Sequence, residues 1–142
     1  YTQSLLLFAY QQSARELTEH LHAQGHAAIR PKHGAVFANL DREGTRPTVL
    51  AQRAGMGKAA VGELVDELER LGYVERRPDP CDRRAKLVVP TSAALEVTRL
   101  VHAFNRKLEA RYRRRLGKQA YDALRHSLIA LAGRDDVQPR IL

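Results

Sequence analysis

Apolar residues recur every three or four positions in two stretches in the middle of the chain. In the first stretch, Leu50, Ala51 and Ala54 fall on one side of a helix. The second stretch has a longer apolar stripe, formed by Val61, Leu64, Val65, Leu68 and Leu71. The sequence Gly55-Met56-Gly57 separates the two stretches, because glycine accepts the positive φ that a tight turn requires. The pattern predicts two short helices joined by a turn.

A strand pattern follows the second stretch. Gly72 is placed to end the helix, and residues 73–77 read as a short strand. Pro78-Asp79-Pro80 predicts a turn, after which the β-branched residues within 86–89 predict the returning strand. The loop between the strands carries Asp82, Arg83 and Arg84. Two helices, a tight turn and a hairpin are the outline of a winged helix-turn-helix, which makes DNA the first partner to consider.

Broad apolar stripes also lie on both sides of this motif. The N-terminal stripe consists of Leu6, Tyr10, Ala14, Leu17 and Leu21. A longer stripe begins after Thr91, a predicted helix cap, and consists of Val97, Leu100, Val101, Phe104, Leu108, Tyr112 and Leu116. Gly117 interrupts it, and a last helix is predicted from Tyr121, Leu124, Leu128 and Leu131, ending at Gly133. Helices with such stripes and no second core can bury them against another copy, which favours a C2 dimer.

The run GELVDELERLGYVERRPDPCDRRAKLVVPT, residues 62–91, resembles the recognition helix and wing of the MarR family of bacterial transcriptional regulators. Asp82-Arg83-Arg84 matches the D-x-R signature of that family's wing. One helix-forming segment before the motif and two after it match the family's layout. The fold expected from the resemblance is mainly α with a small β-hairpin, in a single domain of residues 1–142. Residues 1–30 and 91–142 would be dimerisation helices, and residues 32–90 the DNA-binding part.

The resemblance also carries expectations about function. It implies a homodimer that binds a pseudo-palindromic operator, and we expect a repressor that is released by a small, aromatic or anionic effector. It implies that Arg84, the second arginine of the signature, reads a DNA groove. Related regulators bind small ligands in a crevice between the dimer helices and the winged motif. On this basis the effector-binding candidates are Arg15, His33, Phe37 and His102.

The distribution of charge indicates which part of the motif contributes most of the affinity for DNA. The chain of 142 residues has a formal net charge of +8, which favours a polyanionic partner. The excess lies mainly in residues 99–118, where eight cations face the single carboxylate of Glu109, whereas the predicted recognition helix at 58–70 has a net charge of −2. We therefore expect affinity to come from the wing, where arginines can enter a minor groove. An aspartate beside them, Asp82, would hold an arginine in one orientation.

The first turns of the recognition helix are the candidates for base contacts. Ala59, Ala60 and Gly62 permit close approach, Lys58 precedes them, and Glu63 can accept a hydrogen bond from a cytosine amino group. The alternative is that Glu63 is simply solvated and bases are read elsewhere. The cations expected to meet phosphates and to fix register are Arg53, Arg76, Arg77 and Lys86.

Other functions find less support in the residues. His20, His22 and His26 do not form a recognisable ligand set, so we expect no metal and no cofactor. The lone Cys81 sits beside charged residues in the wing, which keeps a redox-responsive regulator open as an alternative. A winged helix that binds only proteins is a second alternative. No nucleophile elbow or phosphate-binding loop indicates an enzyme. Without an apolar span or an export segment, we expect a cytoplasmic protein.

Overall fold

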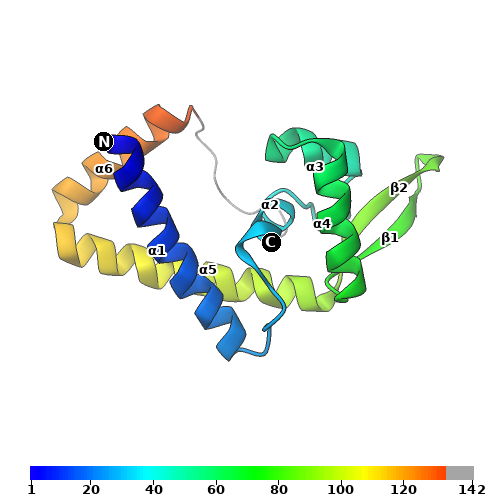
Figure 1. Cartoon of the computed structure of the whole chain (residues 1–142), viewed down its shortest axis with the longest axis horizontal. Helices are drawn as coiled ribbons and strands as arrows, with labels where there is room; N and C mark the ends of the chain where they lie inside the picture. The colour runs from blue at the N-terminus through cyan, green and yellow to red at the C-terminus, as the bar shows by residue number, and fades with distance from the viewer. Residues whose placement is uncertain (134–142) are drawn as a thin grey trace.

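The computed structural model describes residues 1–133. They form a mainly helical chain with one antiparallel hairpin, as the sequence predicts. In chain order the elements are α1 (Thr2–Ala23), the 3-10 turn η1 (Pro31–His33), α2 (Gly34–Phe37), α3 (Pro47–Ala54), α4 (Lys58–Arg70), β1 (Val74–Asp79), β2 (Asp82–Pro90), α5 (Ser92–Leu116) and α6 (Lys118–Ala132). Figure 1 shows α5 as a long helix that α1 crosses. α6 lies at one end of α5, and α3, α4 and the hairpin lie at the other end.

The two central helices end where the apolar pattern predicts. Gly55 follows α3 with φ of 64°, a left-handed conformation that favours glycine. After α4, Gly72 has φ of 81°, and its amide donates to the carbonyl of Glu69. The amide of Tyr73 donates to the carbonyl of Leu68, which completes a Schellman ending. These closures turn the chain directly from α4 into β1.

The hairpin is longer than the sequence suggested, and its turn is shorter. The strands reach Asp79 and Asp82, so only Pro80 and Cys81 lie between them. The expected turn at Pro78-Asp79-Pro80 is therefore wrong by two residues at its start, and Asp82, Arg83 and Arg84 belong to β2 rather than to a loop. β1, which carries Pro78, pairs only with β2, and such an edge strand tolerates proline. The register shift beside Pro78 accommodates that residue.

The core lies where α3, α4 and the hairpin meet the N-terminal part of α5. Its side chains come from every one of these elements: Leu50, Val61, Val65, Leu68, Val88, Ala94 and Val97 are all at most 1% exposed. α1 contributes one buried residue, Leu21. Along α5 the buried positions end at Thr98. The winged motif thus has its own packed interior, whereas the remaining turns of α5 extend beyond it.

The outer helices keep apolar side chains at the surface. On α1 and α6 the exposed large hydrophobic residues are Leu5, Leu6, Leu7, Phe8, Tyr10, Leu124, Leu128 and Leu131. Several of these belong to the stripes that predict dimerisation. None of the helices within residues 1–133 has the length and apolar character needed to cross a membrane.

Thr91 occupies the N-cap position of α5 as predicted, but its side chain does not cap the helix. Its hydroxyl donates instead to the carbonyl oxygens of Gly72 and Tyr73, at 2.7 and 3.0 Å. These carbonyls lie where α4 turns into β1, and that of Tyr73 also accepts the backbone amide of Thr91 at 3.0 Å. Thr91 therefore ties the start of α5 to the end of α4.

Candidate nucleic-acid interface

The first turns of α4 present small and polar residues to solvent. Lys58, Ala59, Ala60 and Glu63 are exposed, because the apolar stripe of the helix turns inward. A Cβ added at Gly62 would meet no other atom within 4 Å. Among the described residues, the carboxylate of Glu63 has no hydrogen bond or ion pair. This end of the helix is therefore exposed enough to enter a DNA groove.

The other carboxylates of α4 are neutralised within the chain. The guanidinium of Arg76, on β1, pairs with both Asp66 and Glu69. Glu67 lies 2.5 Å from the ammonium of Lys32, which holds the pKa of this carboxyl below its ordinary value. Three of the four acidic residues of α4 are therefore engaged on sides of the helix away from its first turns. The acidic count of the helix overstates the repulsion that DNA would meet.

Three cations predicted to contact phosphates have partners inside the protein. Besides Arg76, Arg77 pairs with Glu75 on the same strand. Arg53 donates to the carboxylate of Asp41 at 2.8 Å and to the carbonyl of Asn39. Phosphate contacts by these cations stay predictions, and each would compete with an existing ion pair.

The arginines near the hairpin turn have no such partners. Arg83, Arg84 and Lys86 are exposed, and their side chains make no hydrogen bond or ion pair with residues 1–133. Asp82 accepts a hydrogen bond from the backbone amide of Arg84 at 3.0 Å. The expected contact of Asp82 with an arginine side chain is therefore replaced by a backbone contact, which shapes the start of β2. The guanidinium groups remain free for a ligand.

An ion pair that the sequence did not suggest anchors the hairpin. Asp79, at the end of β1, is only 6% exposed. Its carboxylate accepts the amide of Cys81 at 2.9 Å and the Nε of Arg46 at 2.7 Å. The amide hydrogen bond and then the guanidinium hold the pKa of Asp79 below its ordinary value. Arg46 is the N-cap residue of α3, so the pair fixes the hairpin turn to the helix-turn-helix.

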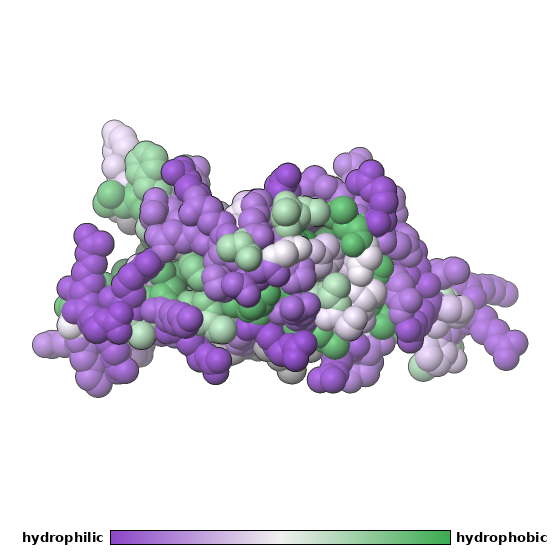
Figure 2. Space-filling model, turned by 90° about the horizontal axis from the view of Figure 1, so that it is seen from below, coloured by the Kyte–Doolittle hydropathy of each residue, from purple (hydrophilic) through white to green (hydrophobic). Residues whose placement is uncertain are grey.

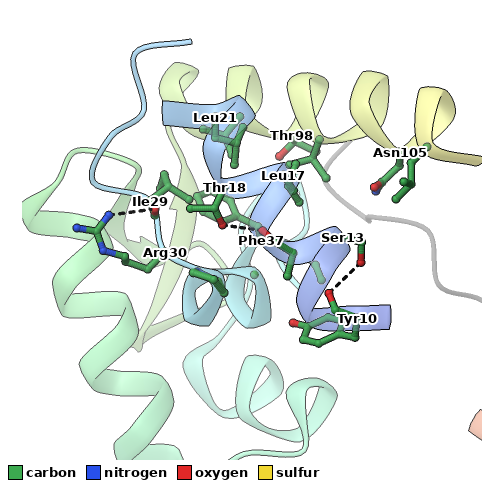
Figure 3. Close-up of a pocket in the computed structure, with 17 residues that line it drawn as sticks. Tyr10, Ser13, Leu17, Thr18, Leu21, Ile29, Arg30, Phe37, Thr98 and Asn105 are labelled. Atoms are coloured by element: carbon green, nitrogen blue, oxygen red, sulfur yellow. Dashed lines mark hydrogen bonds between the residues drawn. The ribbon is translucent and has the colours of Figure 1, made fainter. Parts of the chain in front are cut away.

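A cavity of about 350 Å³ lies between α1, the η1 and α2 segment, and α5. Its walls are mostly apolar, with hydroxyl groups at Ser13, Thr18 and Thr98. Among its lining residues Arg30 is the single charged one, and its guanidinium donates to the carbonyls of Ala27 and Ile29. Figure 3 shows α1 and α5 forming opposite walls, with Arg30 turned toward Ile29 at the edge.

Residues 29–85, which contain the helix-turn-helix and most of the hairpin, match the family model described as MarR family. Over this segment the chain is similar to the MarR family. This family consists of transcriptional regulators and not of enzymes. The arrangement of terminal helices around a winged motif is the MarR fold.

Individual MarR-like proteins are similar over different lengths. The uncharacterized HTH-type transcriptional regulator YcgE of Bacillus subtilis is 44% identical over 45 residues, which span 32% of this chain and 29% of that protein. The structure of CouR from Rhodococcus jostii, bound to p-coumaroyl-CoA, is 25% identical with a TM-score of 0.69, covering 94% of this chain and 92% of CouR. The structure of FabT from Streptococcus pneumoniae, in complex with DNA, has a TM-score of 0.80 at 16% identity and covers 93% of each chain.

One of the four effector-binding candidates lines the cavity. Phe37 forms part of its wall, whereas Arg15, His33 and His102 are absent from the lining. The cavity is built instead by residues that the sequence showed only as helix stripes, such as Tyr10 and Leu17. A stripe identifies which residues turn inward but not whether the space they face is filled.

His33 has a structural position beside the cavity wall. It is fully buried, and its Nδ1 accepts the amide of Arg30 at 3.0 Å. Its Nε2 lies 3.5 Å from the carboxylate of Glu67 on α4. Burial lowers the pKa of His33, since the charged imidazolium loses its hydration, and the attraction of Glu67 offsets this in part. The residue therefore links η1 to the recognition helix.

Within the part of the chain that the structure describes, the histidines and the cysteine are not gathered into one ligand set. His22 and His26 are four residues apart, but α1 ends at Ala23, and His26 contacts the hydroxyl of Tyr73 at 2.8 Å. No group of three or more potential ligands occurs within residues 1–133. Cys81 is an exposed free thiol.

Proposed function

We propose that this MarR-like protein is a DNA-binding transcriptional regulator, acting as a repressor whose homodimer holds a pseudo-palindromic operator. The observation that carries the proposal is the pair of exposed arginines, Arg83 and Arg84, on a hairpin whose turn is anchored to α3. Because the Arg46–Asp79 pair fixes the hairpin, less freedom is lost when the arginines dock. The complex of FabT with DNA supports this use of the fold.

Affinity and sequence reading fall to different parts of the motif. The free guanidinium groups of β2 are suited to the negative potential of a narrow minor groove. The open N-terminal turns of α4 are suited to the major groove, where Glu63 would accept a hydrogen bond from a cytosine amino group. The internal ion pairs of Asp66, Glu67 and Glu69 allow an acidic helix to approach DNA.

The exposed apolar residues of α1 and α6 support a homodimer. Leu5, Phe8 and Leu131 are 70%, 64% and 71% exposed, which is costly for side chains of this size in water. A C2 axis would bury the same residues of both copies at once. It would also present two α4 helices to half-sites about one DNA turn apart.

The cavity is suited to a small effector with an apolar or aromatic body. It holds no carboxylate, and the Nη1 of Arg30 is occupied by backbone carbonyls, so a neutral or singly anionic ligand fits its chemistry. The p-coumaroyl-CoA complex of CouR supports a ligand with an aromatic group. Such a ligand would release DNA only if it prefers a dimer with the wrong half-site spacing. The segment η1, which forms part of the cavity wall, is joined to α4 through the ion pair of Lys32 and Glu67.

The proposal is tested by selecting bound fragments from a random duplex library and measuring affinities with purified protein. Specific binding should lie at about 10⁻⁸ M or tighter at physiological salt. Glu63→Gln should change the preferred base at one position per half-site by about 1–3 kcal/mol while total affinity to its own best site is retained. A flat selection, with only weak and strongly salt-dependent binding, would instead support a protein-interaction module. Loss of binding on oxidation of Cys81 would identify a redox-responsive regulator.

A further inference from the structure

The outer face of α5 carries a row of cations that the winged motif does not use. At about 100° per residue, Arg99, Arg106 and Arg113 fall almost in one line, and Lys107 and Arg114 form a second line beside it. All five are exposed and lie within an arc of about 120°, over about 22 Å of helix. We call these five residues the α5 basic face.

The α5 basic face points away from the core. The buried positions of the helix, Ala94, Val97 and Thr98, lie on almost the opposite side. Ala103 and Ala110 lie between the two lines of cations, so no large side chain separates them. From below, many hydrophilic side chains project at the left end of the molecule, with hydrophobic residues gathered nearer the middle (Figure 2).

Within residues 1–133 these cations are hardly neutralised. Arg113 reaches Asp122 only at 3.9 Å, and the other four form no ion pair with the described residues. Neighbouring cations differ, since Arg111 pairs with Glu16 and Arg125 with Glu109. Five like charges on one face repel one another, so an anionic partner would relieve an unfavourable arrangement.

In a second copy, the described helices that would form the dimer supply few free carboxylates for that role. α1 and α6 carry three carboxylates, of which Glu16 and Asp122 are already in ion pairs and Glu19 remains. On α5 itself, Glu109 is paired and Glu96 lies 3.8 Å from His26. A dimer formed through these helices therefore has too few free carboxylates to cover two basic faces. The apolar residues of α1 and α6 are the better dimer surface.

We propose that the α5 basic face is a second, sequence-independent binding surface for the phosphate backbone of duplex DNA. A duplex presents about one negative charge per 1.7 Å of its axis, enough to meet five cations over the length of this face. The C-terminal half of α5 extends away from the hairpin (Figure 1). The surface would therefore hold a flanking or separate duplex segment rather than the bases beside α4.

The test is the salt dependence of binding to a long random-sequence duplex. Arg106→Glu/Arg114→Glu should lower the slope of log affinity against log salt by about 2 and weaken binding at least about tenfold at about 50 mM salt. Arg106→Lys/Arg114→Lys should retain both values. The matched control, Arg42→Glu/Arg70→Glu, makes the same change of charge at exposed residues elsewhere and should have less effect. Equal effects of the two reversals would overturn the proposal, because only bulk charge would then matter.

Three further measurements separate this surface from others. The reversal variant should remain folded and in the same oligomeric state by circular dichroism and sedimentation, and dissociation into monomers would assign the face to the dimer interface. In the variant Arg83→Ala/Arg84→Ala, which lacks the wing arginines, the α5 basic face should still contribute to random-duplex binding. If the wing variant abolishes that contribution, the second surface does not exist, whereas the proposed operator binding would stand. Tighter binding of polyglutamate or of phosphatidylserine vesicles than of duplex would also overturn the assignment to DNA.

Discussion

At the scale of single residues, the buried Asp79 explains how an exposed hairpin can be held in one position. Its carboxylate accepts hydrogen bonds from the turn and from Arg46, which begins α3. Neither residue was a sequence candidate. They are 33 positions apart, and a lone arginine or aspartate gives no periodic signal that would pair them. Such contacts depend on the distance between elements after folding.

Asp79→Asn should weaken specific DNA binding while the affinity for random duplex changes little. The amide can still accept the amide hydrogen bond of Cys81, but it loses the charge that holds Arg46. We expect a loss of about 1 kcal/mol, typical of weakened hydrogen bonding to a charged partner, measured by titration of the selected site. Glu75→Gln, on the same strand, is the control. Unchanged specific affinity in Asp79→Asn would show that the ion pair does not position the hairpin.

His33 makes stability depend on pH in a defined window. Burial lowers its pKa in the folded protein from the ordinary value of 6.5, although Glu67 opposes the shift, and Lys32 and Arg30 add to it. The unfolded chain therefore binds the proton more readily than the folded one. The free energy of unfolding should be constant just above pH 6.5 and should fall as the pH drops from there through the lowered pKa.

Denaturant unfolding across this range checks the effect, with His33→Gln as the comparison. The variant should have a flatter profile below pH 6.5, because the titrating imidazole is gone. The carboxyls of Glu67 and Asp79, whose pKa values lie below their ordinary values of 4.5 and 3.8, contribute only at lower pH. Equal slopes for both proteins between pH 5 and 6.5 would show that His33 is not the group responsible.

At the scale of elements, helices were easier to predict than the hairpin. The apolar stripes placed α3, α4, α5 and α6 correctly, because burial of one face repeats every three or four residues. The predicted hairpin turn is displaced because Pro78 favours a turn in the sequence, whereas an edge strand tolerates it. Residue preferences alone favour a turn at Pro78, but the pairing of β1 with β2 places this residue in a strand.

The electrostatic character of α4 was also read incompletely from the sequence. Its net charge predicts that the helix adds little affinity for DNA, but Lys32 and Arg76 come from other elements and pair with three of its four carboxylates. Charge counted along one helix therefore differs from the charge that a ligand meets. Most residues of the cavity lining escape prediction for a similar reason, since they come from α1, α2 and α5 together.

At the scale of the whole molecule, the proposed dimer makes its own prediction. Leu5→Asp/Leu128→Asp places charges on the exposed apolar faces of α1 and α6, which are 70% and 38% exposed at these positions. Each leucine buried at an interface contributes about 1.5–3 kcal/mol, so the dimer dissociation constant should rise at least about 100-fold. Sedimentation equilibrium measures it. Met56→Asp, on the exposed turn after α3, should leave the oligomeric state unchanged; a dimer of unaltered affinity in the double variant would place the interface elsewhere.

We propose that the anchored hairpin binds DNA through Arg84. The most direct test is the affinity of Arg84→Ala for the selected site at one fixed salt concentration, beside Arg70→Ala on the far end of α4. Arg84 is exposed and its side chain makes no ion pair within residues 1–133, so the fold should not change. We expect a loss of about 1–3 kcal/mol for Arg84→Ala and little for Arg70→Ala. Equal affinities of Arg84→Ala and the unaltered protein would contradict this proposal.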